Sequence, residues 1–558
     1  MSCVGVATRN LSRMASEPAD GGQGGSAAID GLIDPEDPSA TYVLEPDVVA
    51  PLVARIVTSH TAGDHRSLLP FTGAPLAAIP LSSVEDVADA VGRARRAQRS
   101  WAHTTVAERA AVLLRFHDLV LERQSEVLDL LQMETGKSRR SAFEEVADIA
   151  QVTRHYGVRA GAYLADRRVG GMLPVLTRAT VHRRPVGVVG AIAPWNYPLT
   201  LGLAEALPAL VAGNAVVLKP DPQTSLTALW AAELLEEAGL PGDLFLVVAG
   251  GGDIGAALTG HVDHIAFTGS TTTGRKVAAQ AGERLIGTTL ELGGKNPLYV
   301  AADAHVPSAA QGAVRACFSN SGQLCVSIER LILHEDIAEE FLDAFVPLVR
   351  GLTLGTALDY SVDMGSLTSQ AQLDRVVAHV DDALAQGARV LAGGVHRADI
   401  GPFFYAPTVL DHVPPTADCA HEETFGPVVS VTRVPDDATA IRVMNDSEYG
   451  LSASIWTQDT ARGRRLAAQV EAGAVNINDG YASAFGSVSA PMGGFKSSGQ
   501  GRRHGREGIE ALTEPQTIVV QRGVSRWLSF DTLYAQPGDR PSRLLTAAFS
   551  VMKKLRLP

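Results

Sequence analysis

The pattern of hydrophobic and polar positions divides the chain into two regions. Residues 85–165 combine Ala and Leu with charged residues at helical spacing, as in VEDVADAVGRARRAQRSWA, and predict a series of helices. From residue 186 onward, short apolar runs such as VGVVGAIAP and AVVLKP alternate with helical stretches. This alternation is typical of βαβ units on a parallel sheet, so the sequence predicts an α/β fold.

Individual elements can be located from the same pattern. The stretch LTLGLAEALPALVAG, residues 199–213, predicts one helix that ends at Gly213. After residue 291 the alternation resumes with the strand PLYVAA, a helix over residues 305–320 and a helix over residues 337–350. We therefore expect a second α/β domain in this half of the chain. A length of 558 residues also exceeds what one hydrophobic core organises.

Charge and cysteine content narrow the functional classes. A net charge of −13 argues against nucleic-acid binding, which usually requires a basic face. The four cysteines are scattered rather than paired, which suits a reducing, cytoplasmic compartment: Cys3, Cys317, Cys325 and Cys419. No apolar run approaches the ~18 residues of a membrane span.

The two ends of the chain differ from its middle. Residues 1–45 are rich in Gly, Ala, Ser and acidic residues, and we expect an N-terminal extension that is mostly disordered. The segment LLTAAFSVMKKLRLP, within a C-terminal tail of residues 526–558, mixes apolar and basic residues. It could contact a membrane surface or a partner, but we expect a short helix packed on its own protein.

Two glycine-containing loops are candidates for phosphate binding. AGGGDIGAAL matches the G-x-G-x-x-G pattern at Gly250, Gly252 and Gly255, but it lacks the acidic residue expected about 20 residues later. We interpret it as a tight turn. FTGS places Gly269 and Ser270 where a strand gives way to a helix, and the N–H groups of a helix N-terminus bind phosphate.

Polar residues follow several predicted strands. They are Asn196 in APWNYP, Lys219 in LKP, Glu291 in LELGGKNP and Glu423 in EETFGP, and Cys325 ends the polar stretch SNSGQLC. Ligands in open α/β sheets bind at the carboxyl ends of strands. Each residue alone has a plain structural explanation, such as a turn or an inert buried thiol. Together they form a coherent set for chemistry on a carbonyl group.

These segments resemble the aldehyde dehydrogenase superfamily. APWNYP, LKP, FTGST, LELGGKNP, GQLC, EETFGP and PMGGFKSSG match its motifs in family order over about residues 50–525. SVDMGSL, SAPMGG and GRRHGREG look most like the bacterial succinate-semialdehyde dehydrogenases of the second type. The resemblance implies NAD(P)+-dependent oxidation of an aldehyde, most simply succinate semialdehyde, to a carboxylic acid.

The resemblance also implies roles for individual residues. Cys325 would be the nucleophile that forms a thiohemiacetal and then a thioester. Asn196 and the Cys325 backbone N–H would form the oxyanion hole, and Glu291 would be the general base for hydrolysis. No metal is implied, and His261 and His264 in HVDH have no third ligand nearby.

Cofactor contacts follow in the same way. The resemblance assigns Gly269 and Ser270 to the pyrophosphate, and it assigns the remaining contacts to Trp195, Lys219, Glu423 and Phe425. NAD-preferring relatives commonly have Glu three residues after the lysine, where this chain has Pro222. We therefore expect NADP, with NAD possible because Asp221 lies one residue away.

The substrate is less clearly specified by the sequence. Typical succinate-semialdehyde enzymes use arginines to bind the distal carboxylate, yet residues 199–213 contain no Arg and Ser319 occupies the second position. Arg315 lies one helical turn earlier. A more apolar aldehyde is therefore the alternative, with Leu199, Leu203 and Leu324 as its apolar wall.

The resemblance implies three structural parts. We expect a Rossmann-like cofactor domain over residues 46–290, interrupted by an oligomerisation hairpin at 167–186, and a catalytic domain over 291–511. A strand at 512–525 would complete a small β extension and favour a homodimer or homotetramer. A non-catalytic scaffold would be expected to lose Cys325, Glu291 or Asn196, and a CoA-acylating enzyme would have little need of a water-activating Glu291.

Overall fold

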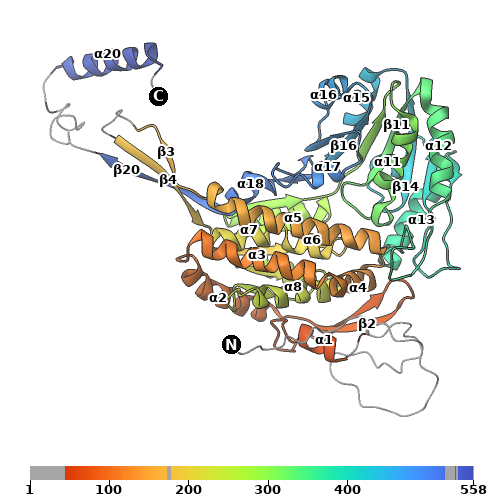
Figure 1. Ribbon diagram of the computed structural model, residues 1–558, viewed down its shortest axis with the longest axis horizontal. Helices are drawn as coiled ribbons and strands as arrows, with labels where there is room; N and C mark the ends of the chain where they lie inside the picture. Colours follow the sequence, from red (N-terminus) through yellow and green to blue (C-terminus); the bar gives the residue numbers. More distant parts are fainter. Residues whose placement is uncertain (1–43, 45, 172–176, 522–534, 536–537, 557–558) are drawn as a thin grey trace.

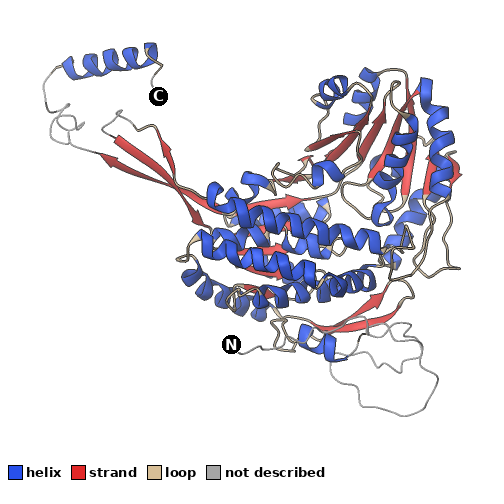
Figure 2. Cartoon of the chain, in the orientation of Figure 1, coloured by secondary structure: helices blue, strands red, loops and turns tan. Residues whose placement is uncertain are grey.

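The structure is a computed structural model that describes residues 44, 46–171, 177–521, 535 and 538–556. Two sheets covered by helices form the body, and a narrow three-stranded sheet projects from it (Figures 1 and 2). The predicted α/β fold is confirmed. Apart from Leu44, the N-terminal extension predicted to be disordered lies outside the described residues.

The first sheet has six strands in the order β19-β9-β8-β5-β6-β7, and all neighbours except the β19–β9 pair are parallel. Its strands are β5 (Val188–Ile192), β6 (Ala215–Lys219), β7 (Phe245–Val247), β8 (His264–Thr268), β9 (Gly287–Glu291) and β19 (Gly499–Gln500). Every residue of β5 and β6 is buried, as continuous apolar runs in a parallel sheet predict. Asn196, Lys219 and Glu291 therefore do lie at or just beyond strand ends.

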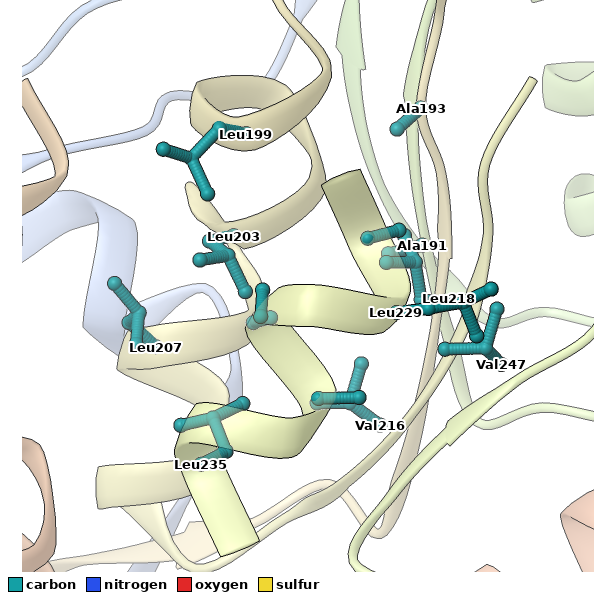
Figure 3. Packing of buried hydrophobic residues seen from close by; sticks show 14 of the residues in the cluster. Ala191, Ala193, Leu199, Leu203, Leu207, Val216, Leu218, Leu229, Leu235 and Val247 are labelled. Carbon is teal, nitrogen blue, oxygen red and sulfur yellow. The ribbon is translucent and has the colours of Figure 1, made fainter. Parts of the chain in front are cut away.

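Helices cover both faces of this sheet. One face carries α2 (Val84–Trp101), α9 (Gly252–Thr259) and α10 (Thr271–Glu283). The other carries α7 (Ala206–Ala212) and α8 (Ser225–Glu237), backed by α3 (Val106–Glu122), α4 (Gln124–Thr135) and α5 (Arg139–Tyr163). Buried leucines of α6 (Pro198–Leu203), α7 and α8 belong to one apolar cluster with residues of β6 and β7, in which Leu229 of α8 lies beside Leu218 of β6 (Figure 3). Each fully buried leucine contributes about 1.5–3 kcal/mol.

The N-terminal helices begin at specific capping residues. Ser83 starts α2 and Thr105 starts α3, each in a capping box with the acid three residues later. Before them, α1 (Pro46–Val53) leads to the antiparallel pair β1 (Asp64–Leu69) and β2 (Ala74–Pro80). The tight turn proposed at Gly250–Gly255 is present, since it connects β7 to α9.

The second sheet has seven strands in the order β12-β13-β14-β11-β10-β16-β17, and only the β12–β13 pair is antiparallel. The strands are β10 (Asn296–Val300), β11 (Ile328–His334), β12 (Arg389–Ala392), β13 (Thr408–Asp411), β14 (Val428–Val434), β16 (Ser452–Trp456) and β17 (Ala474–Ile477). Its helices include α11 (Val306–Phe318), α12 (Ala338–Arg350), α13 (Gln370–Ala385), α15 (Asp437–Asn445) and α16 (Thr460–Ala467). The helices predicted at 305–320 and 337–350 correspond to α11 and α12.

The projecting sheet joins distant parts of the chain. β4 (Thr177–Pro185) pairs antiparallel with both β3 (Arg167–Val169) and β20 (Thr513–Gln521), and α18 (Gly505–Glu510) precedes β20. β4 and β20 lie within the ranges 167–186 and 512–525 that were expected to form the small β extension. On β20, Ile518, Val519 and Val520 are exposed.

Two sequence predictions need correction. Residues 198–212 form two helices, α6 and α7, rather than one, because the chain turns at Ala204 and Glu205. Gly213 does end the second of them with a left-handed φ of 100°. The C-terminal segment forms α20 (Arg540–Lys554), but Leu544, Phe549 and other apolar residues are exposed, so these side chains do not pack against the described part of the protein.

Candidate active site

A cavity of about 220 Å³ opens where the first sheet ends and the second begins. It is lined by eight of the nine predicted site residues: Trp195, Asn196, Gly269, Ser270, Glu291, Cys325, Glu423 and Phe425. The ninth, Lys219, ends the neighbouring strand β6, where it pairs with Ile192 of β5. Residues separated by up to 230 positions in the chain thus surround one space. Asn196 and Glu291 lie there at or just beyond strand ends, as predicted. Glu423 instead follows the short helix α14 (Asp418–His421) and precedes β14, so the prediction that it follows a strand is wrong.

The thiol of Cys325 follows an unusual backbone segment. After α11 ends at Phe318, Asn320 and Ser321 both adopt left-handed φ values of 50° and 54°. Such conformations are costly for residues other than glycine and persist only where the surroundings hold them. Here the Asn320 backbone N–H donates to Ser141 Oγ at 3.0 Å, and Asn320 Nδ2 donates to the Gln323 carbonyl at 2.9 Å. The cysteine is therefore presented by a rigid turn.

The Asn196 turn is fixed by a buried ion pair that the sequence did not reveal. Lys137 Nζ donates to the Asn196 carbonyl at 2.7 Å and pairs with Glu145, and both side chains are completely buried. Glu145 in turn accepts the backbone N–H groups of Leu199 and Thr200 at 2.9 and 3.1 Å. Asn196 Nδ2 donates to the Gln323 carbonyl at 3.1 Å, which links this turn to the segment before Cys325.

Burial determines the protonation of the two reactive groups. It raises the pKa of the Cys325 thiol to about 12, so the thiol is protonated at neutral pH. It also raises the pKa of Glu291 to about 7, because the carboxylate loses hydration at the buried end of β9. The Arg503 guanidinium opposes both pKa increases. A carboxyl with a pKa near neutrality beside a protonated thiol is suited to accept a proton.

A second buried ion pair holds the opposite wall. Lys295 pairs with Glu329, and Glu329 accepts the N–H groups of Thr424 and Phe425 at 2.9 Å each. This fixes Phe425 at a left-handed φ of 55°, with its ring edge-to-face on Trp195 at a centroid distance of 5.6 Å.

Glu423 on the same loop accepts the Gly294 N–H at 2.8 Å. A Cβ on Gly293 would lie 2.5 Å from a Glu423 carboxylate oxygen, so a larger residue there would displace the Glu423 side chain.

The residues present fit a dinucleotide. Ser270 caps α10 with its hydroxyl on the Thr273 N–H, so the positive end of the helix dipole points toward the cavity. Lys219 Nζ donates to the carbonyls of Pro220 and Gly250 at 2.9 and 2.7 Å and has a third N–H for a ribose or phosphate oxygen. Asp221 instead turns toward its own chain, where it accepts the Gln223 N–H at 3.0 Å.

A second cavity of about 140 Å³ borders the cysteine segment on another side. Its wall includes Tyr197, Arg315, Leu324, Tyr481 and Phe485. Within the described ranges, no group of three His, Cys, Asp or Glu side chains could hold a metal ion, and His264 lies in β8 with its Nε2 at 3.2 Å from Thr289 Oγ1. No helix in the described part of the chain is long and apolar enough to cross a membrane.

Half-buried Glu144 accepts the hydroxyl groups of Tyr197 and Tyr481 in the second cavity at 3.0 and 3.2 Å, and the Arg315 guanidinium lies 5.8 Å from the Tyr481 ring centroid. Arg315 therefore faces this cavity, one helical turn before Ser319. The sequence identified Arg315 only as an arginine one helical turn before position 319, where the carboxylate-binding arginine was expected.

Comparison with known proteins agrees with this geometry. Residues 56–518 match the model of the aldehyde dehydrogenase family. The chain is 53% identical over 453 residues to "Putative succinate-semialdehyde dehydrogenase [NADP(+)] 2" of Mycobacterium tuberculosis, which covers 81% of this chain and 88% of the relative. A protein of Mycolicibacterium smegmatis named "Putative succinate-semialdehyde dehydrogenase [NADP(+)]" is 50% identical over 486 residues, 87% of this chain and 93% of the relative.

Solved structures give the same result. The crystal structure of succinate-semialdehyde dehydrogenase from Burkholderia pseudomallei has a TM-score of 0.79 and 35% sequence identity, covering 82% of this chain and 95% of that one. An aldehyde dehydrogenase structure from Brucella melitensis has a TM-score of 0.80 at 31% identity, over 84% of this chain and 96% of the other. From the site geometry, the family match and these relatives, the chain belongs to the aldehyde dehydrogenase family.

Proposed function

We propose that this enzyme oxidises succinate semialdehyde to succinate with NADP+. One observation carries the proposal: the Cys325 segment separates a cavity lined by Glu291 and dinucleotide-binding residues from a second cavity faced by Arg315. The relatives at 50% and 53% identity bear the names of NADP+-dependent succinate-semialdehyde dehydrogenases.

The chemistry follows from three side chains of this chain. Cys325 gives its thiol proton to Glu291, which passes it on to solvent, and the sulfur attacks the aldehyde carbon. The carbonyl oxygen becomes an oxyanion bound by the Asn196 amide and the Cys325 backbone N–H. Losing one such donor removes about 3 kcal/mol of transition-state stabilisation. The nicotinamide, when bound, accepts the hydride. Glu291 then takes a proton from the water that hydrolyses the resulting thioester, which releases the carboxylic acid and the thiol.

The preference for NADP rests on the residues after β6. Pro222 stands at the position where NAD-preferring relatives have Glu, so no carboxylate there repels a 2′-phosphate. Asp221 is the nearest acid, but its Oδ1 is occupied as the cap of the following turn. The Lys219 ammonium ends the strand beside it and supplies a positive charge to a phosphate oxygen.

Recognition of the distal carboxylate is the role we assign to Arg315. A small carboxylate needs a cation when it leaves water. Arg315 faces the second cavity together with Tyr197 and Tyr481, and the neighbouring wall of Leu324 and Phe485 surrounds the carbon chain. Glu144 already accepts both tyrosine hydroxyls, so these rings are fixed in place beside the arginine.

Substrate ranking tests the proposal. We expect succinate semialdehyde to exceed hexanal and benzaldehyde in kcat/KM, and Arg315→Gln to raise KM for succinate semialdehyde about tenfold or more. The same change should leave KM for hexanal nearly unchanged. A wild-type enzyme that favours hexanal would refute the assigned substrate and support the apolar aldehyde. No reduced cofactor with any aldehyde would support the scaffold alternative.

Assembly and location belong to the same proposal. The apolar residues exposed on β20 lie in a projecting sheet of three strands, and an exposed edge of this kind is usually covered by another chain. We therefore infer a homodimer or homotetramer. The free thiols of Cys317, Cys325 and Cys419 suit a reducing compartment, so we infer a cytoplasmic enzyme.

A further inference from the structure

A buried arginine stands behind the proposed general base. Arg503 is 3% exposed, in the segment GRRHG that precedes α18. Its Nε lies 3.0 Å from Glu205 Oε1 and 3.9 Å from Glu291 Oε1, and its Nη2 donates to Thr268 Oγ1 at 2.9 Å. Both carboxylates are also buried, with exposed fractions of 5% and 4%. One guanidinium thus faces two carboxylates in a region without bulk water.

The backbone of Arg503 is fixed from both sides. Its N–H donates to the Met492 carbonyl, and its carbonyl accepts the Met492 N–H, each at 2.8 Å. Met492 packs in the apolar cluster that includes Leu324 and contacts Cys325. Because the guanidinium is also held by Thr268, at the end of β8, it cannot follow Glu291 freely. The arginine is a fixed charge rather than a flexible partner.

The pairing with Glu291 is incomplete. Glu291 Oε1 is buried and accepts no hydrogen bond from the described residues, although Arg503 Nε is within 3.9 Å. Glu205 Oε1 lies closer to the same nitrogen, at 3.0 Å, but this contact is an ion pair without hydrogen-bond geometry. A carboxylate that must exchange protons with water and thiol cannot be held in a tight bidentate pair, which would keep it ionised and immobile.

We propose that Arg503 is a positioning residue that stabilises the ionised form of Glu291, and that Glu205 limits this effect by competing for the same guanidinium. This inference rests on the proposed role of Glu291 as general base. The two neighbours then act on Glu291 with opposite sign. The positive charge of Arg503 favours deprotonation of Glu291. Glu205 disfavours it in two ways, because its negative charge repels that of Glu291 and offsets part of the positive charge of Arg503.

Other ionisable groups face the same cluster. Asp148 and Tyr156 approach from α5 and Cys325 from the segment before β11, and Arg502 and His504 flank the arginine in sequence. Burial lowers the pKa of His504 to about 3, so His504 is uncharged near neutral pH and supplies no positive charge. Burial raises the pKa of Asp148 to about 7, and this carboxyl can contribute only negative charge. Arg503 is the nearest of these cations to Glu291 for which a contact is present.

The test uses Arg503→Gln, Arg503→Lys and Glu205→Gln in the full-length enzyme. Arg506→Gln is the matched control, because Arg506 lies three residues later and pairs with Glu510 at 3.2 Å on the surface. The first measurement is the pH profile of kcat/KM with saturating NADP+. The second is the rate of Cys325 alkylation by iodoacetamide against pH in the cofactor-free enzyme.

The expected shifts have opposite directions. Arg503→Gln should move the acid midpoint of kcat/KM upward by about one pH unit, and Glu205→Gln should move it downward. Arg503→Lys should stay near the wild-type midpoint because the charge is kept, and Arg506→Gln should coincide with wild type. The alkylation rate at a fixed, mildly alkaline pH should fall in Arg503→Gln, because Arg503 opposes the raised pKa of Cys325 and its loss leaves less thiolate.

Several results would overturn the inference. A purely structural role would be indicated if Arg503→Gln and Glu205→Gln lower kcat/KM without shifting its acid midpoint and without changing the alkylation rate. Shifts of the acid midpoint in the same direction would indicate the same. If Arg503→Gln does not fold, Glu205→Gln decides alone, because an unchanged or raised midpoint contradicts the competition. A wild-type enzyme without dehydrogenase activity would refute the proposed function, while the alkylation profile would still measure the charge of Arg503.

Discussion

Breaking the buried Lys295–Glu329 pair tests how the cofactor side of the cavity is built. Both side chains are at most 3% exposed, and Glu329 also accepts the N–H groups of Thr424 and Phe425. Lys295→Met leaves a buried carboxylate without its cation, and Glu329→Gln leaves a buried ammonium without its anion. Removing one partner of such a pair costs about 3–5 kcal/mol.

This energy can be converted into a melting temperature. Unfolding entropy of about 2.1 cal/mol/K per residue gives ~1.2 kcal/mol/K for a chain of this length that unfolds in one step. Each single substitution should therefore lower Tm by roughly 3–4 °C. Glu329→Gln should also raise KM for NADP+ about tenfold or more, because the loop that carries Glu423 and Phe425 loses a charged acceptor worth about 1.5–3 kcal/mol per bond.

The assay is a double-substitution cycle read by calorimetry at one scan rate and one protein concentration. Lys295→Met/Glu329→Gln should lose clearly less than the sum of the single losses, because each single change leaves a charge unpaired and the double change leaves none. Arg397→Gln is the control, since the exposed Arg397–Asp399 pair should contribute at most about 1 kcal/mol. Additive single losses would refute the reasoning, as would a Tm loss in Arg397→Gln equal to theirs.

Three further changes test other parts of the structure. Glu291→Gln should lower kcat about 10²–10⁴-fold. It should also abolish the fall in rate below pH 7 that the wild-type enzyme shows, because Glu291, with a pKa of about 7, becomes protonated there and cannot act as a base. A variant whose rate still falls at acid pH would contradict this assignment. Pro222→Glu should lower the ratio of kcat/KM with NADP+ to kcat/KM with NAD+ by about tenfold or more, because the new carboxylate would face and repel the 2′-phosphate. An unchanged ratio would remove the basis of the cofactor assignment. Gly213→Ala should lower the free energy of unfolding by about 1 kcal/mol or more, because alanine is strained at a φ of 100°. KM should stay unchanged. Thermal melting measures the stability, and steady-state kinetics measures KM.

The sequence predicts those site residues that follow strands. Asn196, Lys219 and Glu291 could be placed because the apolar runs before them define buried strands whose carboxyl ends meet at one edge of a sheet. Arg503, Lys137 and Glu145 could not be placed in the same way. They stand in polar stretches such as GRRHG and METGKS, which read as solvent-exposed, and only the packing of distant segments removes their water.

The same limit explains the corrections. The helical period continues through residues 199–213, but the chain turns at Ala204, and Glu205 reaches Arg503, which lies almost 300 positions later. A local pattern cannot contain that contact. For the C-terminal segment, the pattern specified a helix with an apolar side and basic residues, and α20 has both. Whether its apolar side is covered depends on a partner surface, which no local pattern encodes.

Three buried ion pairs lie around the cavity: Lys137–Glu145, Lys295–Glu329 and Arg503–Glu205. The role of the Arg503–Glu205 pair differs from that of the other two. Glu145 and Glu329 each accept two backbone N–H groups from a loop of the cavity wall, so an apolar replacement of either pair would leave those donors buried without acceptors. Their function is to fix loop geometry. Glu205 and Arg503 instead share their charge with Glu291, a side chain that must change protonation. A pair that only fixed a loop would be satisfied by hydrogen bonds, whereas Glu205 Oε1, Arg503 Nε and Glu291 Oε1 all lack a hydrogen-bond partner among the described residues. These three groups therefore interact through charge alone, which leaves Glu291 able to change its protonation.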